Sequence, residues 1–236
     1  MDDFRQRTAL LLGEDAMSRL QDAHVAVFGL GGVGGACAEA LCRAGIGHMT
    51  IVDNDTVSLS NINRQIIAMH STVGLSKTAA LHKRLLDINP NCDIREMNLF
   101  FDVSTADAFD FSDFDYIIDA IDTVSAKLLL IARANAAGTP ILSCMGTGNK
   151  LDPTRLRIDA IEKTSVCPLC RVMRRELRAR GISGTRVLWS DEQPCVPIEQ
   201  LSENGRHPPG SVSFVPPVAG MILAGQVIRE LSAQSN

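Results

Sequence analysis

Five residues in the first quarter of the chain have the types and spacing of a nucleotide site. Gly29, Gly31 and Gly34 match the pattern GxGxxG in the stretch GLGGVG, and Gly32 adds a further glycine. Glycines here let backbone N–H groups and a helix N-terminus meet a phosphate without an intervening Cβ. Asp53 ends the next apolar segment, where a carboxylate can accept hydrogen bonds from ribose hydroxyls. The combination favours a nucleotide site over a purely structural tight turn.

Charged residues further along the chain indicate which nucleotide such a site would hold. Arg64 in NINRQ and Lys77 at the start of a helical stretch would place cations near the loop. A dehydrogenase needs a roughly neutral place for its nicotinamide ring. A site that cleaves ATP instead needs cations that stabilise charge on the transferred phosphoryl group and on the departing pyrophosphate. Either cation alone is more simply a solvated surface charge, but together they favour ATP.

Two aspartates extend this interpretation. Asp119 and Asp122, in IDAID, lie at the expected carboxyl end of a strand, which is where open α/β sheets bind ligands. One carboxylate together with phosphate oxygens is a usual arrangement for magnesium. The simpler alternative is that Asp122 caps the following helix. Asp55, in the acidic cluster VDND, is a further candidate for nucleotide binding.

The elements that must position these residues alternate between strand and helix. This order predicts an α/β fold: a Rossmann-like, doubly wound, mostly parallel sheet with helices on both faces. The apolar run DYIIDAID is typical of a strand buried on both sides. Strands are expected at 24–28, 48–53, 92–100, 115–122 and 140–146, and helices at 33–44, 76–90 and 125–137.

The chain is expected to form a single domain in three parts: an N-terminal helix within 1–22, a nucleotide-binding core over 23–150 and an extension over 151–236. The extension would contain a basic helix at 168–180, an irregular segment at 190–210 and a closing helix at 217–231. The N-terminal helix, over 3–22, is expected to carry four residues on its apolar side, namely Leu10, Leu11, Met17 and Leu20.

The composition limits the class of protein. The 236 residues are 45% hydrophobic and 21% charged, with a net charge of −4, which is typical of a globular protein and argues against nucleic-acid binding over the whole surface. We expect neither a signal peptide nor a membrane-spanning segment. Seven cysteines scattered through apolar segments predict buried thiols and a cytoplasmic location.

The motifs GLGGVG, NINRQ, VGLSK and DAID, together with Asp53, resemble in order and spacing the ThiF/MoeB/HesA superfamily of adenylating enzymes, which are related to ubiquitin activators. The resemblance covers residues 3–150. It implies that ATP and magnesium bind here. The roles implied are phosphate binding for Gly29, Gly31, Gly32 and Gly34, ribose binding for Asp53, stabilisation of phosphate charge for Arg64 and Lys77, lining of the site for Asn61 and Gln65, and magnesium binding for Asp122.

The same resemblance implies a homodimer with shared active sites. In such enzymes an arginine of the N-terminal helix reaches the ATP of the partner subunit. Arg7, in FRQRTALLLGE, is the best positional match, and Arg5 is the alternative.

Longer motifs narrow the resemblance. The stretches GTGNKLDPTRLRI, KTSVCPLCRVMRRELRARGI and GSVSFVPPVAGMILA are similar to the tRNA threonylcarbamoyladenosine dehydratases. The reaction implied is adenylation of the threonyl carboxylate on a modified adenosine of tRNA, followed by attack of the ureido nitrogen and ring closure with net loss of water. The implied partner is tRNA. A sulfur-transfer protein is a further partner that the resemblance leaves open.

A basic helix offers a candidate surface for an RNA partner. Four arginines recur at positions i, i+3, i+4 and i+7, which form one face of a helix: Arg171, Arg174, Arg175 and Arg178. The opposite face would be apolar. An arginine stripe on an acidic protein suits phosphate contact, and an ordinary solvated helix face is an equally good interpretation.

The cysteines bear on the alternatives. Some family members hold zinc in two CxxC pairs, but this chain has only Cys167 and Cys170, so we expect no zinc; Cys195 and His207 would have to complete four ligands. The main alternative function is activation of a ubiquitin-like sulfur carrier, for which Cys195 would be the catalytic thiol. A dinucleotide oxidoreductase and a non-catalytic scaffold fit the charged positions less well.

Overall fold

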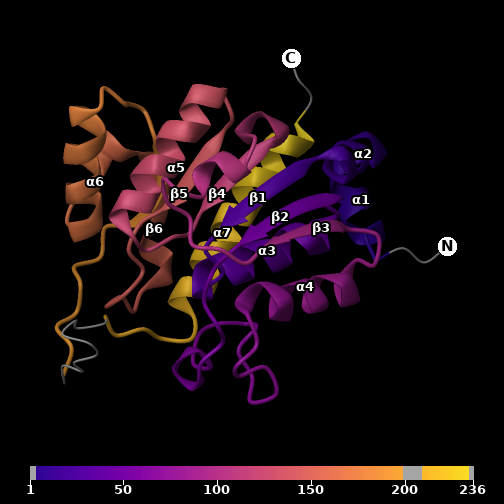
Figure 1. Cartoon of the computed structure of the whole chain (residues 1–236), viewed down its shortest axis with the longest axis horizontal. Helices are drawn as coiled ribbons and strands as arrows, with labels where there is room; N and C mark the ends of the chain where they lie inside the picture. Colours follow the sequence, from indigo (N-terminus) through magenta and orange to yellow (C-terminus); the bar gives the residue numbers. More distant parts are fainter. Residues whose placement is uncertain (1–3, 199–208, 234–236) are drawn as a thin grey trace.

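One sheet of seven strands runs through the part of the chain that the computed structural model describes, residues 4–198 and 209–233 (Figure 1). The strand order is β3-β2-β1-β4-β5-β7-β6, and all neighbours are parallel except β6 and β7, which are antiparallel. The strands are β1 (His24–Phe28), β2 (His48–Val52), β3 (Asp93–Met97), β4 (Tyr116–Asp119), β5 (Ile141–Cys144), β6 (Leu156–Ala160) and β7 (Arg186–Ser190). The predicted doubly wound, mostly parallel α/β fold is confirmed.

Helices cover both faces of the sheet because the central strands are apolar on both sides. In β1, Val25 and Val27 pack into one core and Ala26 and Phe28 into the other. The first core contains residues of α2, α3, α4 and α7, and the second contains residues of α5 and α6. The α-helices are α1 (Gln6–Leu12), α2 (Glu14–Asp22), α3 (Gly32–Ala44), α4 (Lys77–Ile88), α5 (Val124–Ala137), α6 (Pro168–Ala179) and α7 (Val215–Ser232). Short 3-10 helices span Leu59–Asn61, Ala106–Ala108, Phe111–Asp113, Pro153–Arg155 and Ile161–Lys163.

The N-terminal segment differs from the single helix predicted over 3–22. It forms two helices, α1 and α2, that meet at Gly13, whose φ of +84° lies outside the helical region. The break turns the two halves in different directions. Met17 and Leu20 are buried as expected, whereas Leu10 and Leu11 are 82% and 86% exposed.

The last third of the chain holds two strands that the sequence interpretation did not predict, β6 and β7. β7 lies between β5 and β6, and its pairing with β5 extends the parallel sheet beyond the predicted core. The run RVLWS carries the signal in its β-branched and aromatic residues, but it is short and immediately precedes the irregular segment. Residues 199–208 of that predicted irregular segment lie outside the described residues.

The closing helix packs along the helix that begins at the glycine loop. A Cβ added to Gly220 of α7 would lie 2.3 Å from the carbonyl oxygen of Val33 in α3, so the two helices are in backbone contact. A Cβ on Gly32 would lie 2.9 Å from Pro216, at the start of α7. The C-terminal helix therefore helps to hold the glycine loop. Among helices in residues 4–198 and 209–233, none combines the length and hydrophobicity needed to cross a bilayer.

Candidate active site

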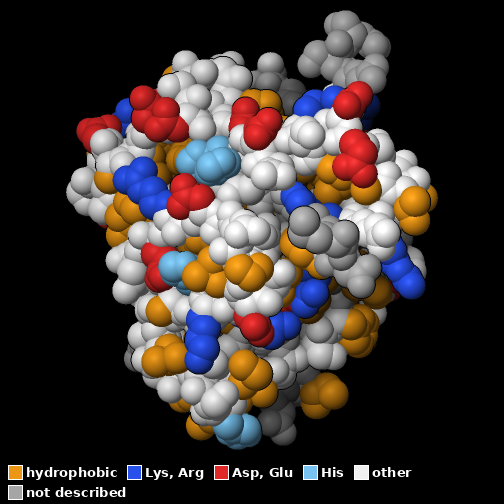
Figure 2. Space-filling model, turned by 90° about the vertical axis from the view of Figure 1, so that its right-hand side faces the viewer, with side chains coloured by type: hydrophobic (Ala, Val, Ile, Leu, Met, Phe, Trp, Pro, Cys, Tyr) orange, Lys and Arg blue, Asp and Glu red, His pale blue; other side chains and the backbone are white. Residues whose placement is uncertain are grey.

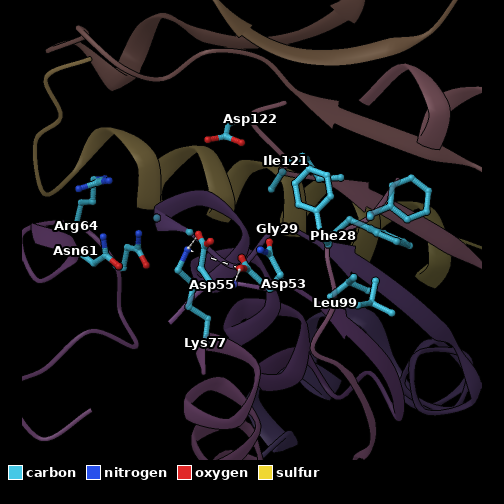
Figure 3. A pocket seen from close by; sticks show the side chains of 18 residues that line it. Phe28, Gly29, Asp53, Asp55, Asn61, Arg64, Lys77, Leu99, Ile121 and Asp122 are labelled. Carbon is cyan, nitrogen blue, oxygen red and sulfur yellow. Dashed lines mark hydrogen bonds and ion pairs between the residues drawn. The ribbon is translucent and has the colours of Figure 1, made fainter. Parts of the chain in front are cut away.

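A cavity of about 390 Å³ opens at the carboxyl ends of β1, β2 and β4 (Figure 3). This is the edge where parallel sheets bind ligands, because the connections to the following helices diverge there. Its polar and charged lining comprises Gly29, Gly31, Gly32, Asp53, Asn54, Asp55, Asn61, Arg64, Gln65, Lys77 and Asp122. Its apolar lining comprises Phe28, Val52, Leu99, Phe100, Phe101, Ala120 and Ile121.

The glycines of the loop serve two different purposes: Gly29 and Gly34 allow close packing of backbone on backbone, and Gly31 leaves space at the cavity. Gly29 has φ +87°, and a Cβ there would meet the carbonyl oxygen of Ala120 at 2.6 Å. Gly34 allows α3 to cross β1, since its Cβ would lie 1.7 Å from the carbonyl oxygen of Gly29. Gly31 has only the side-chain nitrogen of Gln65, at 3.9 Å, near its missing Cβ.

The phosphate-binding role that the resemblance implied for Gly34 differs from its place in the structure, because Gly34 does not line the cavity. Close packing of helix against strand accounts for the missing side chain instead. Gly31, in contrast, is the N-cap of α3 and has no side chain that could cap the helix, so the first turn presents its N–H groups at the cavity.

Asp53 links the end of β2 to the glycine loop. One carboxylate oxygen accepts the N–H of Leu30 at 2.6 Å, and the other accepts the N–H of Asp55 at 2.8 Å. Each oxygen has a second lone pair available. Asp53 therefore fixes the loop, and its carboxylate lines the cavity.

Lys77 is the most enclosed cation of the cavity. Its side chain is 7% exposed, and its Nζ lies 2.6 Å from Asp55 Oδ2 and 3.8 Å from Asp53 Oδ1. A buried ammonium needs such partners because desolvation would otherwise favour its neutral form. Asp55 is 60% exposed, so this side of the ion pair is open to solvent. Figure 3 shows both carboxylates beside the ammonium group.

The segment 59–65 brings three predicted residues to the opposite wall. Arg64 donates from Nη1 to the carbonyl oxygen of Ser60 at 3.0 Å and to Asn63 at 2.9 Å. Asn61 accepts the N–H of Ser58 and so closes the short 3-10 helix. Gln65 is buried, and its Oε1 has no hydrogen-bond partner within the described residues. This buried oxygen can accept a hydrogen bond from a group that enters the cavity.

The two aspartates at the end of β4 have different environments. Asp122 is exposed and lines the cavity, and its carboxylate accepts only a 3.3 Å hydrogen bond from the Thr123 hydroxyl among its recorded contacts. Asp119 is fully buried and lies 2.9 Å from the buried Lys127, and it also accepts the Ser143 hydroxyl. Asp119 was predicted to bind the nucleotide, but the structure places it behind the cavity, because its carboxylate is used to neutralise Lys127.

Sequence reasoning missed the apolar wall. Leu99, Phe100 and Phe101 follow β3, and Ile121 follows β4. Phe101 is held in place by Phe28, with the two rings edge to face and 5.0 Å apart. The run NLFF overlaps the end of the strand predicted over 92–100, and because β3 ends earlier, at Met97, these residues follow the strand and gather at the ligand edge of the sheet.

Arg7 does not line the cavity of its own chain. It lies exposed on α1. A role for Arg7 in this cavity therefore needs a second copy of the chain.

The cysteines are placed as expected, with one exception. Six are buried and Cys195 is exposed. A hydrogen bond from Cys170 lowers the pKa of the Cys167 thiol to about 5, while the pKa of Cys170 is raised. Within residues 4–198 and 209–233, no group of three His, Cys, Asp or Glu side chains could hold a metal ion. His207, the fourth zinc ligand considered, lies outside the described residues.

A second hollow, of about 1010 Å³, lies along α6, and we call it the arginine groove. It is lined by Ile161, Glu162, Arg171, Arg174, Arg175, Arg178, Ala179, Gly181, Ile182 and Ser183. The prediction that the four arginines share one face of this helix is therefore confirmed, and Met173 and Leu177 are buried on the other face.

The four arginines of the groove are not equivalent. Arg174 donates to the carbonyl oxygen of Thr164 at 2.7 Å, and Arg175 pairs with Glu176 at 2.9 Å. Arg171 and Arg178 are exposed, and no side-chain partner is recorded for either within the described residues. Two arginines are therefore available to an external anion.

Comparison with known proteins shows the family of this chain. The model of the ThiF family matches residues 5–236. The tRNA threonylcarbamoyladenosine dehydratase of Bacillus subtilis is 39% identical to the chain over 236 residues, covering 95% of this chain and 93% of the relative. The crystal structure of Escherichia coli tRNA N6-threonylcarbamoyladenosine dehydratase, TcdA, in complex with ATP superposes with a TM-score of 0.88 at 32% identity, covering 98% of this chain and 96% of that one. The molybdopterin-synthase adenylyltransferase of Escherichia coli is 36% identical over 129 residues, covering 55% of this chain and 51% of the relative.

Proposed function

Because the chain belongs to the ThiF family, we propose that it is an ATP-dependent tRNA threonylcarbamoyladenosine dehydratase. The observation that carries the proposal is the cavity itself, which joins an apolar wall, a helix N-terminus and two cations at one edge of the sheet. The extent of the match to the dehydratase relative supports the choice of substrate. The adenylyltransferase relative matches only 55% of the chain, so activation of a sulfur carrier is the less favoured function.

The reaction follows from the chemistry of the carboxylate. A carboxylate resists attack because oxide would have to leave. Attack of its oxygen on the α-phosphorus of ATP releases pyrophosphate and forms an acyl-adenylate. The nearby ureido nitrogen then attacks the acyl carbon, AMP leaves, and the nitrogen loses its proton as the ring closes. Because nucleophile and acyl group belong to one nucleoside, this second step is intramolecular and favoured.

The cavity residues divide between the parts of ATP. Adenine would lie against Leu99, Phe101 and Ile121, and Asp53 would accept the ribose hydroxyls. The phosphates would lie at the N-terminus of α3 beside Gly31 and Gly32. Asn61 and Gln65 would complete the wall, the latter through its unpaired oxygen.

The charged residues would act on the reacting phosphates. Arg64 and Lys77 would stabilise the negative charge on the α-phosphate and on the departing pyrophosphate, with Lys77 leaving Asp55 as the phosphates enter. Asp122 would hold magnesium, since its carboxylate faces the cavity with a single weak internal hydrogen bond. When bound, the ion neutralises phosphate charge.

Two features would serve the tRNA and the partner subunit. Arg171 and Arg178 of the arginine groove would contact tRNA phosphates. Arg7 would cross to the ATP of a second copy in a homodimer. The substrate is an RNA and the thiols are mostly buried and unpaired, so we place the protein in the cytoplasm. A sulfur-transfer protein remains a candidate further partner.

Mass spectrometry of the nucleoside tests the function. The protein is incubated with ATP, magnesium and tRNA carrying threonylcarbamoyladenosine, and we expect that nucleoside to lose one water. A matched reaction with tRNA lacking the threonyl group should give neither water loss nor AMP. Pyrophosphate exchange driven by a small carrier protein, without water loss, would favour the sulfur-carrier alternative. Binding of NAD in place of ATP would reject both.

Subunit mixing tests the role of Arg7. Arg7→Ala and Asp122→Ala should each be inactive alone. If Arg7 acts in the partner's site, a mixed dimer contains one intact site, so mixing should restore up to about a quarter of wild-type activity. Mixtures of either variant with a doubly substituted chain should stay inactive. Absence of any recovery after confirmed subunit exchange would contradict sharing.

A further inference from the structure

A buried ion pair lies directly behind the loop that carries Asp122. Asp119 is the last residue of β4 and Lys127 lies in the first turns of α5; both side chains are 0% exposed, with 2.9 Å between Nζ and Oδ1. The hydroxyl of Ser143 donates to the second carboxylate oxygen from the neighbouring position on β5. The pair is thus held from β4, β5 and α5 together.

The cost of this pair argues that it does more than stabilise the fold. Removing both charges from water has a large free-energy cost, and well-packed apolar residues often replace such a pair without loss of stability. A buried pair is therefore weak evidence for stability. The pair does fix the position of the backbone around it, because the buried ammonium and carboxylate keep their partners only while β4, β5 and α5 hold these relative positions.

The geometry it defines is that of the cavity loop. Oδ1 of Asp119 accepts the N–H of Ile121 at 3.1 Å as well as the Lys127 ammonium. The N–H of Ala120 donates to Phe28 at 2.8 Å, and the N–H of Lys127 donates to Thr123 at 3.0 Å. The loop that joins β4 to α5 is therefore held at both ends and in its middle. Ile121 and Asp122 of this loop both line the cavity (Figure 3).

We infer that Lys127 and Asp119 are positioning residues for magnesium-ATP, which act through the loop that presents Asp122. The inference rests on the proposed function in one respect, the magnesium role of Asp122. Partners that orient a metal ligand typically contribute about 10- to 100-fold to metal affinity.

The test measures ATP binding by calorimetry, with magnesium and with EDTA in its place. The variant Lys127→Met/Asp119→Leu replaces the whole pair and avoids an unpaired buried charge. We expect it to lose about 10- to 100-fold of the affinity that magnesium adds, and to bind ATP in EDTA like the wild type. In the Asp122→Asn background the same replacement should have no further effect.

Matched variants separate positioning from stability. Arg133→Met/Asp107→Leu removes an exposed pair, 2.7 Å apart, that joins α5 to the 3-10 helix Ala106–Ala108, and it should leave magnesium-ATP affinity unchanged. If the buried replacement fails to fold by circular dichroism, Ser143→Ala removes one hydrogen bond from Asp119, and a several-fold loss is expected only with magnesium. Lys127→Arg alone keeps the buried positive charge. It should therefore lose less of the affinity that magnesium adds than Lys127→Met/Asp119→Leu does.

An unchanged gain from magnesium in a folded variant would overturn the inference, as would an equal loss with magnesium and with EDTA. The titration requires no tRNA. A wild-type protein that gains affinity from magnesium but does not dehydrate its tRNA would therefore reject the proposed function and leave this inference standing.

Discussion

The nucleotide cavity and the arginine groove present their cations differently. In the cavity, Lys77 is 7% exposed and lies between two carboxylates, whereas Arg171 and Arg178 project from one helix into solvent. A buried charge must keep its partners, so its position is defined before a ligand arrives. Exposed arginines on flexible stems can reach many phosphate positions, and salt screens their attraction. The cavity is suited to one small ligand and the groove to a long polyanion.

The end of the molecule away from α6 provides a reference for the groove. Figure 2 shows acidic and basic side chains interspersed on that face, with hydrophobic side chains between them. The arginine groove differs from that face, because four arginines line it in one row on a protein of net charge −4. Substitutions in the cavity should change rates by orders of magnitude, and substitutions in the groove should change affinity and its salt dependence.

The largest effect is expected for Asp122→Ala. Without this carboxylate, magnesium would lose its proposed protein ligand and would no longer be held beside the phosphates. Pyrophosphate release on the modified tRNA should therefore fall by about 100- to 1000-fold. The melting temperature should not change, because Asp122 is exposed and has one weak hydrogen bond. Asp107→Ala, at another exposed aspartate, serves as the control. Full activity of Asp122→Ala would remove it from the magnesium role.

Substitutions at two glycines of the stretch GLGGVG should distinguish a loss of folding stability from a loss of ATP affinity. Gly34→Ala should destabilise the protein by about 3 kcal/mol or more in guanidinium unfolding, because its Cβ would overlap the backbone of Gly29. Gly31→Ala has room in the fold and should keep its stability, yet its methyl group would crowd the phosphates and weaken ATP binding by about tenfold. Equal stability of the two variants would contradict this division.

Charge reversal in the groove should have a smaller effect. Arg171→Glu/Arg178→Glu should weaken tRNA binding by about tenfold and reduce the slope of log affinity against log salt by about one for each lost phosphate contact. The affinity for ATP should stay the same. Lys83→Glu/Arg95→Glu makes the same charge change at two other exposed positions and should have little effect. Unchanged tRNA binding across salt concentrations would reject the groove as the RNA surface.

The smallest effect is expected for Cys195→Ser. Cys195 is the exposed thiol and should be the first to react with iodoacetamide, while the six buried thiols are protected. The dehydratase reaction needs no thioester, so the variant should retain its full rate in the mass-spectrometric assay. A large loss of activity would instead support the sulfur-carrier alternative.

Local patterns predicted most of the fold and much of the cavity. The expected strands lie where β1 to β5 are found, and α3 begins one residue before its predicted start. These features could be predicted because hydrophobic period, helix stops and strand length are properties of neighbouring residues. The bend at Gly13 is also local, but a glycine alone does not show whether a helix continues through it.

The α/β class, the glycine loop and the charged residues at the strand ends could all be predicted from local patterns. Which of two aspartates three residues apart faces the cavity could not be predicted, because burial of Asp119 depends on Lys127 and on Ser143 of another strand. The tertiary structure likewise shows that Gly34 packs while Gly31 faces the cavity, and that Arg174 is tied to Thr164 while Arg171 is not. The physical reason is common to these cases: burial and pairing depend on contacts between segments that are distant in the chain, whereas spacing reports only on neighbours.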